Sequence, residues 1–424
     1  MATIKQLSGR EVLDSRGRPT VLATCVLEDV TTASASVPSG ASTGTAEAFE
    51  LRDGDPKRYQ GSGCRRAVAN IAGEIQSALG GRAFEDQSKL DHALIALDGT
   101  PTKSRLGANA ILAVSVAFAR ASALSRGIPL YRHFSDMIGF PANRLPRLTI
   151  NLFSGGKHAG QQVSVQDVLI IPMSAQTIDE TLVCASDIYQ AAADLILRKY
   201  GMRLLTADEG GLAPPCRSAE EMLALAAEAI ELAGYAPGKD VFLGIDVASS
   251  HFYEEGRYKK DGEILDSAGM IRAVGQWLEK YPILSVEDGL AEDDWKHWPE
   301  LRRAIAGRAL TLGDDLLCTN PTRIRRAIDA KACDALLLKV NQIGTLTEAI
   351  EAYKLARAAG WSVTLSVRSG ETEDNWAADL AVGWGADQFK NGSIRQSERL
   401  AKYNRLLEIE ELTHWPLTAW PRVE

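Results

Sequence analysis

The sequence lacks paired cysteines, an excess of positive charge, long apolar runs, and repeated or low-complexity segments. Its six cysteines are dispersed without a Cys-x-x-Cys pair, so neither a disulfide framework nor a zinc site is expected. Lys and Arg total 47 against 55 Asp and Glu, a net charge of −8, which does not favour nucleic-acid or membrane partners. No apolar run reaches membrane-spanning length, and the first residues form no secretory signal. We therefore expect a soluble cytoplasmic protein.

The chain is long enough for more than one domain, with 424 residues of which 45% are hydrophobic. Residues 3–7, 20–27 and 31–37 are predicted to be short strands of an antiparallel meander, followed by helices near 64–79 and 107–126. Residues 1–138 are therefore predicted to form an α+β domain. Two prolines between 140 and 146 mark a linker, and residues 139–424 form the second domain.

An apolar stretch in the second domain, Ala335 to Leu338, is followed at once by Lys339. A short run without polar residues is typical of a strand that is buried on both faces. Such a strand delivers one amine to the edge of its sheet. Lys339 is therefore a candidate base.

Five neighbouring segments repeat this pattern of an apolar run followed by ionisable residues. The residues at these five predicted strand ends are Asp246, Glu287, Asp314, Arg368 with Ser369, and Lys390. Helical patterns such as 321–332 and 345–359 fill the gaps, which predicts alternating strands and helices with parallel strands. A single acid before a helix is usually an N-cap, but six charged strand ends in register are typical of an α/β barrel active site.

Three further segments are candidates for the site. The small-residue loop from Pro38 to Gly44 is either a flexible turn or a mobile lid whose hydroxyls, such as that of Ser42, reach a metal or phosphate. The segment 154–167 carries His158 and Asp167, and Glu209 lies just before a glycine turn. A lone histidine is usually structural, so His158 alone does not establish chemistry.

Taken together, these segments resemble enolase from end to end. The matching stretches are Glu11–Gly17, Pro38–Gly44, Gly107–Leu112, Asp208–Gly211, Asp246–Ser250, Asp314–Leu316, Thr319–Pro321, Lys339–Gly344 and Arg368–Asp374. The resemblance implies an α/β fold class, with an enolase-type modified α/β barrel and an N-terminal α+β domain. It also implies removal of the proton α to the carboxylate of 2-phosphoglycerate and loss of the 3-hydroxyl, which gives phosphoenolpyruvate.

The resemblance implies two Mg²⁺ ions in each active site. By similarity, Asp246, Glu287 and Asp314 bind the first ion, since a hard cation takes oxygen ligands. A second ion is expected to arrive with the substrate and to be held in part by Ser42. Two dications stabilise the negative charge that develops on the substrate carboxylate.

The same resemblance assigns the remaining roles. Lys339 is the expected base, kept neutral by burial and by the positive charges of Lys390, Arg368 and the metal ions. Lys390 is expected to contact the substrate carboxylate, and Arg368 and Ser369 to receive the phosphate. Glu209 is the expected proton donor to the leaving hydroxyl. Asp167 is a partner of Glu209, and His158 lines the same pocket.

The chain departs from the enolase pattern at several positions near the side from which the hydroxyl leaves. Val367 replaces a histidine, Asp167 replaces a glutamate, and Ser154 replaces an asparagine. Three alternatives therefore remain open. The chain is an ordinary enolase, a specialised paralogue similar to the carboxyphosphonoenolpyruvate synthases, or a catalytically silent binding protein. For either enzyme we expect a small phosphorylated or phosphonylated carboxylic acid as substrate and a homodimer or higher homo-oligomer.

Overall fold

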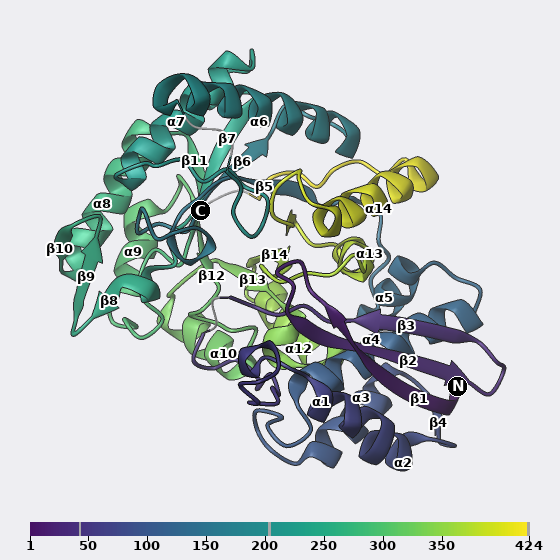
Figure 1. Cartoon of the computed structure of the whole chain (residues 1–424). Helices are drawn as coiled ribbons and strands as arrows, with labels where there is room; N and C mark the ends of the chain where they lie inside the picture. Colours follow the sequence, from purple (N-terminus) through teal and green to yellow (C-terminus); the bar gives the residue numbers. More distant parts are fainter. Residues whose placement is uncertain (42–43, 202–204, 422–424) are drawn as a thin grey trace.

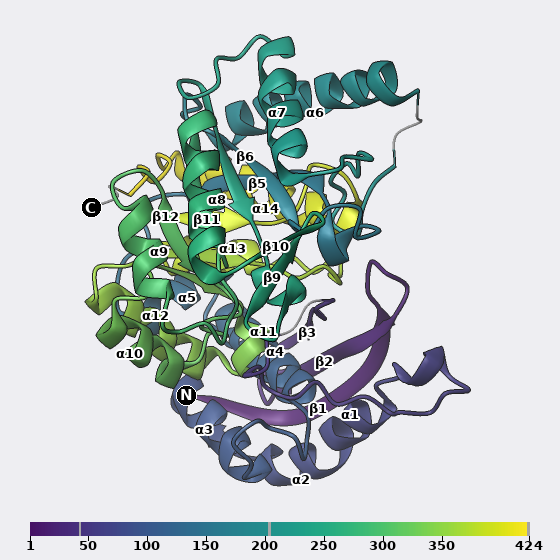
Figure 2. The same cartoon turned by 90° about the vertical axis from the view of Figure 1, so that its left-hand side faces the viewer.

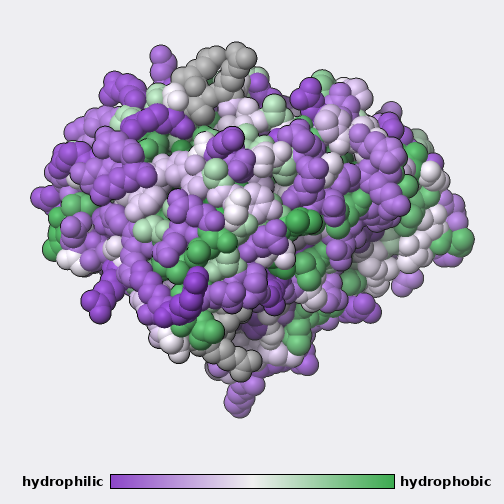
Figure 3. Space-filling model, turned by 90° about the horizontal axis from the view of Figure 1, so that it is seen from above, coloured by the Kyte–Doolittle hydropathy of each residue, from purple (hydrophilic) through white to green (hydrophobic). Residues whose placement is uncertain are grey.

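The protein consists of an N-terminal α+β unit beside a closed eight-stranded barrel, as the computed structural model shows (Figure 1). The structure describes residues 1–41, 44–201 and 205–421. The predicted α/β fold class and barrel architecture are confirmed. In Figure 2 the N-terminal sheet curves below the barrel. The face in Figure 3 is mainly hydrophilic, with hydrophobic residues in small patches.

The N-terminal unit contains the predicted meander, in the strand order β3-β2-β1-β4. Its strands are β1 (Ala2–Leu13), β2 (Pro19–Leu27), β3 (Thr32–Ser36) and β4 (Ala83–Phe84). Strand β1 is longer than predicted, because it continues through Gly9, which packs closely against Ile71. The helical segments are η1 (Tyr59–Gly61), α1 (Arg65–Asn70), η2 (Ile71–Ile75), α2 (Gln76–Leu79), α3 (Gln87–Asp98), α4 (Ala108–Ser125) and α5 (Leu130–Ile138).

Helix α4 packs against β2 and β3, as its apolar composition predicts. By length and composition this helix could cross a membrane, with a mean hydropathy of 1.4 over 18 residues. The expectation that no run reaches such a length is therefore wrong. However, 83% of the helix is buried inside the protein, where it forms the core of the N-terminal unit.

The barrel closes in the strand order β11-β12-β13-β14-β15-β5-β6-β7. All neighbouring strands are parallel except β6, which is antiparallel to both β5 and β7. A loop without a long crossover helix joins β5 to β6, and such a connection permits only antiparallel pairing. The strands are β5 (Arg147–Ser154), β6 (Asp167–Pro172), β7 (Val241–Asp246), β11 (Ile283–Glu287), β12 (Leu310–Gly313), β13 (Ala335–Leu338), β14 (Ser362–Ser366) and β15 (Gln388–Lys390).

Helices surround the barrel, and their apolar faces pack against the outer faces of the strands. They are α6 (Ile178–Tyr200), α7 (Ala219–Leu232), α8 (Ser267–Lys280), α9 (Trp298–Ile305), α10 (Pro321–Ala330), α11 (Val340–Ile343), α12 (Leu346–Ala358), α13 (Trp376–Gly383) and α14 (Ser397–Thr413). Short elements extend the loops: η3 (Gly156–His158), η4 (Ser249–Phe252), β8 (Tyr253–Glu254), β9 (Arg257–Lys260) and β10 (Glu263–Leu265).

Candidate active site

The carboxyl ends of the parallel strands bring the predicted residues to one rim of the barrel. Strands β7, β11 and β15 end at Asp246, Glu287 and Lys390, and Asp246 pairs in register with Glu287. Strand β6 runs the opposite way, so its first residue, Asp167, lies at this rim. Asp167 pairs in register with Asp246 on one side and with Ser154 on the other.

The Lys390 ammonium lies between two of the predicted metal ligands. Its Nζ donates to Asp246 Oδ2 over 2.8 Å and to Glu287 Oε2 over 2.7 Å. Burial raises the pKa of Asp246, but Lys390 outweighs it and lowers that pKa to about 2. Burial and the neighbouring Asp246 together raise the pKa of Glu287 well above its ordinary value. Of the two acids, Asp246 therefore holds the negative charge more readily.

Lys339, directly after β13, hydrogen-bonds Asp314, which directly follows β12. Burial, Arg368 and Lys390 lower the pKa of Lys339, as predicted, but Asp314 and Glu287 outweigh them and raise it. Within the protein alone, the contact with Asp314 therefore favours the charged amine, and a neutral Lys339, which was expected to depend also on the metal ions, stays a prediction. The sequence showed the nearby positive charges but did not show that a carboxylate would contact the amine.

The predicted ligands of a cation lie on three consecutive strands of the barrel. Asp246, Glu287 and Asp314 are buried, and Glu287 Oε1 has no hydrogen-bond partner within the described parts of the chain. A buried carboxylate oxygen without a partner, among further carboxylates, fits a hard cation such as Mg²⁺. Two tighter acidic groups lie nearby, namely His158 with Asp167 and Glu209, and Asp288 with Asp314 and Asp315.

His158 joins Asp167, on the strand next to Asp246, to Glu209. Its Nδ1 lies 2.8 Å from Asp167 Oδ2, and its Nε2 lies 3.9 Å from Glu209 Oε1. Burial lowers the pKa of His158, but the two carboxylates outweigh it and raise that pKa to about 9. Burial raises the pKa of Glu209, yet His158 and nearby cations lower it overall. These shifts favour a protonated His158 beside an ionised Glu209 at neutral pH.

Arg368 and Ser369 follow β14. Ser369 contacts the small-residue loop itself, and Arg368 contacts the segment that follows the loop. The two terminal nitrogens of Arg368 donate to the Glu47 carboxylate over 3.0 Å each. The Ala41 amide donates to Ser369 Oγ over 2.8 Å. A cavity of about 270 Å³ beside Arg368 is lined by Gly40, Gly44, Glu47, Asn109 and Asn341, among others. Ser42, the predicted ligand of a second ion, lies outside the described residues.

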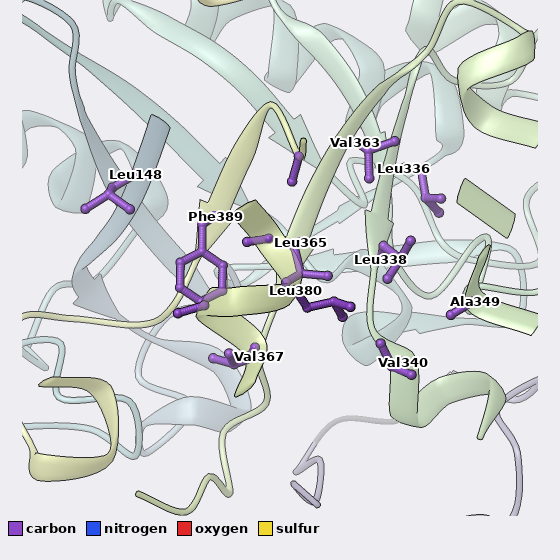
Figure 4. Packing of buried hydrophobic residues seen from close by; sticks show 14 of the residues in the cluster. Leu148, Leu336, Leu338, Val340, Ala349, Val363, Leu365, Val367, Leu380 and Phe389 are labelled. Atoms are coloured by element: carbon purple, nitrogen blue, oxygen red, sulfur yellow. The ribbon is translucent and has the colours of Figure 1, made fainter. Parts of the chain in front are cut away.

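Val367, where the enolase pattern has a histidine, is 5% exposed and belongs to the main hydrophobic cluster. Figure 4 shows its side chain near those of Phe389 and Leu365. Val367 follows the last residue of β14 and lines one small cavity with Leu365 of that strand and Leu380 of α13. The side chain at this position therefore contributes to packing between β14 and α13.

Several residues that fix the geometry of the site were not predicted from the sequence to belong to it. Asp288 accepts from the backbone amides of Asp314 and Asp315 over 3.0 and 2.8 Å and so fixes that turn. Gln342 donates to Asp314 Oδ1 over 2.8 Å, and Gln166 donates to Asp246 Oδ2 over 3.0 Å. Asp288 and Gln166 are next to predicted residues in the sequence, and Gln342 lies within the matching stretch Lys339–Gly344. Glu47 carried no such signal, because its partner, Arg368, is far away in the sequence.

Comparison with known protein families accounts for nearly the whole chain. The model of the enolase N-terminal domain matches residues 4–134. The model of the enolase C-terminal TIM barrel domain matches residues 142–414. The barrel topology, the rim of carboxylates and lysines and these two matches agree with one another, and the chain belongs to the enolase family.

Proposed function

We propose that the protein is a Mg²⁺-dependent lyase that removes the proton α to a carboxylate and expels a β-hydroxyl. The proposed reaction converts 2-phosphoglycerate, or a close analogue, into the corresponding enolpyruvyl ester. One observation carries the proposal. One barrel rim carries three groups of side chains. They are Lys339 with Asp314, Lys390 with Asp246 and Glu287, and His158 with Asp167 and Glu209.

Lys339 is the proposed base. Its Nζ takes the α-proton when the amine is neutral, and Asp314 then stabilises the ammonium that forms. Asp246, Glu287 and Asp314 would hold the Mg²⁺ ion, which would supply positive charge to stabilise the carbanion. Lys390 places a further positive charge beside the substrate carboxylate. Because Asp314 raises the pKa of Lys339, deprotonation of the amine depends on how strongly Asp314 is engaged by other positive charge.

Loss of the hydroxyl completes the proposed reaction. The carbanion electron pair forms the new carbon–carbon double bond as the carbon–oxygen bond breaks. The departing hydroxyl takes a proton and leaves as water. His158 holds the available proton, and Glu209 lies 3.9 Å from its Nε2, so we assign the proton donation to this pair.

The test measures two reactions of the purified protein with Mg²⁺. Formation of phosphoenolpyruvate from 2-phosphoglycerate is followed by ultraviolet absorbance, and exchange of the α-proton is followed by NMR in deuterated water. Lys339→Ala is expected to abolish both while circular dichroism shows an intact fold. The control Lys354→Ala removes an exposed lysine and should retain both. Exchange that persists in Lys339→Ala would show that another group is the base.

A second candidate is a specialised paralogue that acts on a phosphonate or other analogue, similar to the carboxyphosphonoenolpyruvate synthases. The departures at Ser154 and Asp167 favour it, because both residues lie on the side from which the hydroxyl leaves. In that case 2-phosphoglycerate is turned over only slowly, while α-proton exchange persists. For either enzyme we propose a homodimer, which analytical ultracentrifugation tests directly.

A further inference from the structure

Glu47 forms a buried, two-pronged ion pair with Arg368. Its Oε2 accepts from Arg368 Nη1, and its Oε1 accepts from Arg368 Nη2, each over 3.0 Å. The side chains are only 9% and 2% exposed. A bidentate pair of this kind is strong and weakly screened, because little water reaches it. The terminal edge of the Arg368 guanidinium is therefore already bound to an anion of the chain itself.

The Glu47 carboxylate is held in place by more than Arg368. The Gly44 amide donates to Oε1 over 3.1 Å, and Gln342 Nε2 lies 3.5 Å from the same oxygen. Gln342 also donates to Asp314 Oδ1 over 2.8 Å. Glu47 thus belongs to a hydrogen-bonded chain that connects Arg368 with the residue facing Lys339.

The segment that carries Glu47 has anchors that do not involve its carboxylate. Thr45 donates to Glu292 through its amide over 3.1 Å and through its hydroxyl over 3.0 Å. The Ala48 amide donates to the Gln342 carbonyl oxygen over 2.7 Å. Loss of the Glu47 charge therefore leaves this segment attached to the barrel. The electrostatic effect of the Glu47 carboxylate on Arg368 can therefore be removed without removing the other contacts that attach this segment.

We propose that Glu47 is a specificity-determining residue that competes with the phosphate of the substrate for the guanidinium of Arg368. A phosphate dianion carries more charge and more acceptor oxygens than a carboxylate, so it can displace Glu47, whereas a substrate with a carboxylate at that position cannot. A phosphate bound beside the retained Glu47 charge is also repelled by it. The inference rests on the proposed function and on the expectation that Arg368 receives the phosphate of the substrate.

The experiment measures the dissociation constant of inorganic phosphate by isothermal titration calorimetry, with full-length protein and without turnover. Glu47→Gln keeps the shape and loses the charge, so phosphate should bind about tenfold more tightly, equivalent to about 1.4 kcal/mol. Glu292→Gln is the control, because it removes an equal charge from the barrel-side partner of Thr45 without touching Arg368. It should change the affinity less than about twofold.

Two further variants separate charge from structure. Glu47→Asp keeps the carboxylate and should bind phosphate nearly as weakly as the wild type. If Glu47 acted only through a structural contact, Glu47→Gln and Glu47→Asp would change the phosphate affinity alike. In kinetics, Glu47→Gln should lower KM for the phosphorylated substrate more than it changes kcat. Arg368→Met should abolish phosphate binding in both the wild-type and Glu47→Gln backgrounds.

The outcomes distinguish this inference from the proposed function. The role of Glu47 is overturned if the wild type and Glu47→Gln bind phosphate with equal affinity. It is also overturned if Glu47→Gln and Glu292→Gln gain affinity equally. Either result leaves the lyase proposal intact. Phosphate binding that survives Arg368→Met, or no binding in any variant, removes Arg368 as the phosphate site. That result overturns the inference together with the expected role of Arg368, and it leaves the assignment of Lys339 as the base untouched.

Discussion

Ser154 and Asp167, two positions at which the chain departs from the enolase pattern, are in direct contact. Ser154 Oγ donates to Asp167 Oδ1 over 2.8 Å, and neither residue has measurable exposure. The two strands that carry them pair in register at this point. The two replacements are therefore coupled through one hydrogen bond, and each defines the space available to the other.

The contact predicts that Asp167→Glu destabilises the protein. An added methylene in a fully packed site costs roughly 1–3 kcal/mol of unfolding free energy. Combining Asp167→Glu with Ser154→Ala should recover part of this loss, because the smaller residue makes room. Urea unfolding of both single variants and the double variant measures the coupling. Strictly additive effects would show that the two sites are independent.

We predict that the protein loses unfolding free energy in acid because of His133 on α5. His133 is buried with Nδ1 3.2 Å from Arg126 Nη1, and burial lowers its pKa from 6.5 to about 4. The unfolded chain therefore binds the proton more readily, so stability falls as pH drops from 6.5 towards 4. Between pH 7 and pH 5 this group accounts for about 2 kcal/mol. His133→Gln should lose that part of the pH dependence, measured by urea unfolding at both pH values.

The matched control for this pH effect is His92→Gln, which removes an exposed histidine from α3. It should retain the wild-type difference in unfolding free energy between pH 7 and pH 5. If His133→Gln also kept the wild-type difference in unfolding free energy between the two pH values, the assignment to His133 would be wrong, because carboxylates would then account for the whole pH dependence.

Val367→His, which restores the enolase residue, is predicted to destabilise the protein. The side chain at 367 is buried in a small cavity lined mainly by apolar residues such as Leu365 and Leu380, and a new imidazole there would have to find a partner among the few polar neighbours. An unpaired polar group in such a place costs roughly 1–3 kcal/mol. Val367→Ile, an apolar control, should cost less. Thermal unfolding that is unchanged in Val367→His would instead place this position in contact with polar surroundings.

Metal binding predicts a stability increase that depends on Glu287. Mg²⁺ at 100 times its dissociation constant should raise the unfolding free energy by about 2.7 kcal/mol. Glu287→Gln removes one negative ligand and should greatly reduce this increase, whereas Glu300→Gln, an exposed change on α9, should retain it. Chemical unfolding with and without EDTA provides the measurement. An increase of equal size in both variants would locate the ion elsewhere.

The strand ends could be predicted from the sequence, because apolar runs before Asp246, Glu287 and Lys339 are local patterns. Contacts between distant residues could not. The bond from Lys339 to Asp314 opposes the expected lowering of the lysine pKa. The pairing of Glu47 with Arg368 joins positions that no local pattern relates. Charge balance in this site therefore depends on the tertiary structure more than on the order of residues.

The antiparallel strand β6 divides the site into two parts of different origin. Ser154, His158 and Asp167 come from one short hairpin between β5 and β6, whereas the base and the acidic ligands come from separate strand–helix units. Exchange of that single hairpin could alter which group departs from the substrate while the carbanion chemistry stays fixed. Diversification within this architecture is therefore expected to proceed through the hairpin first.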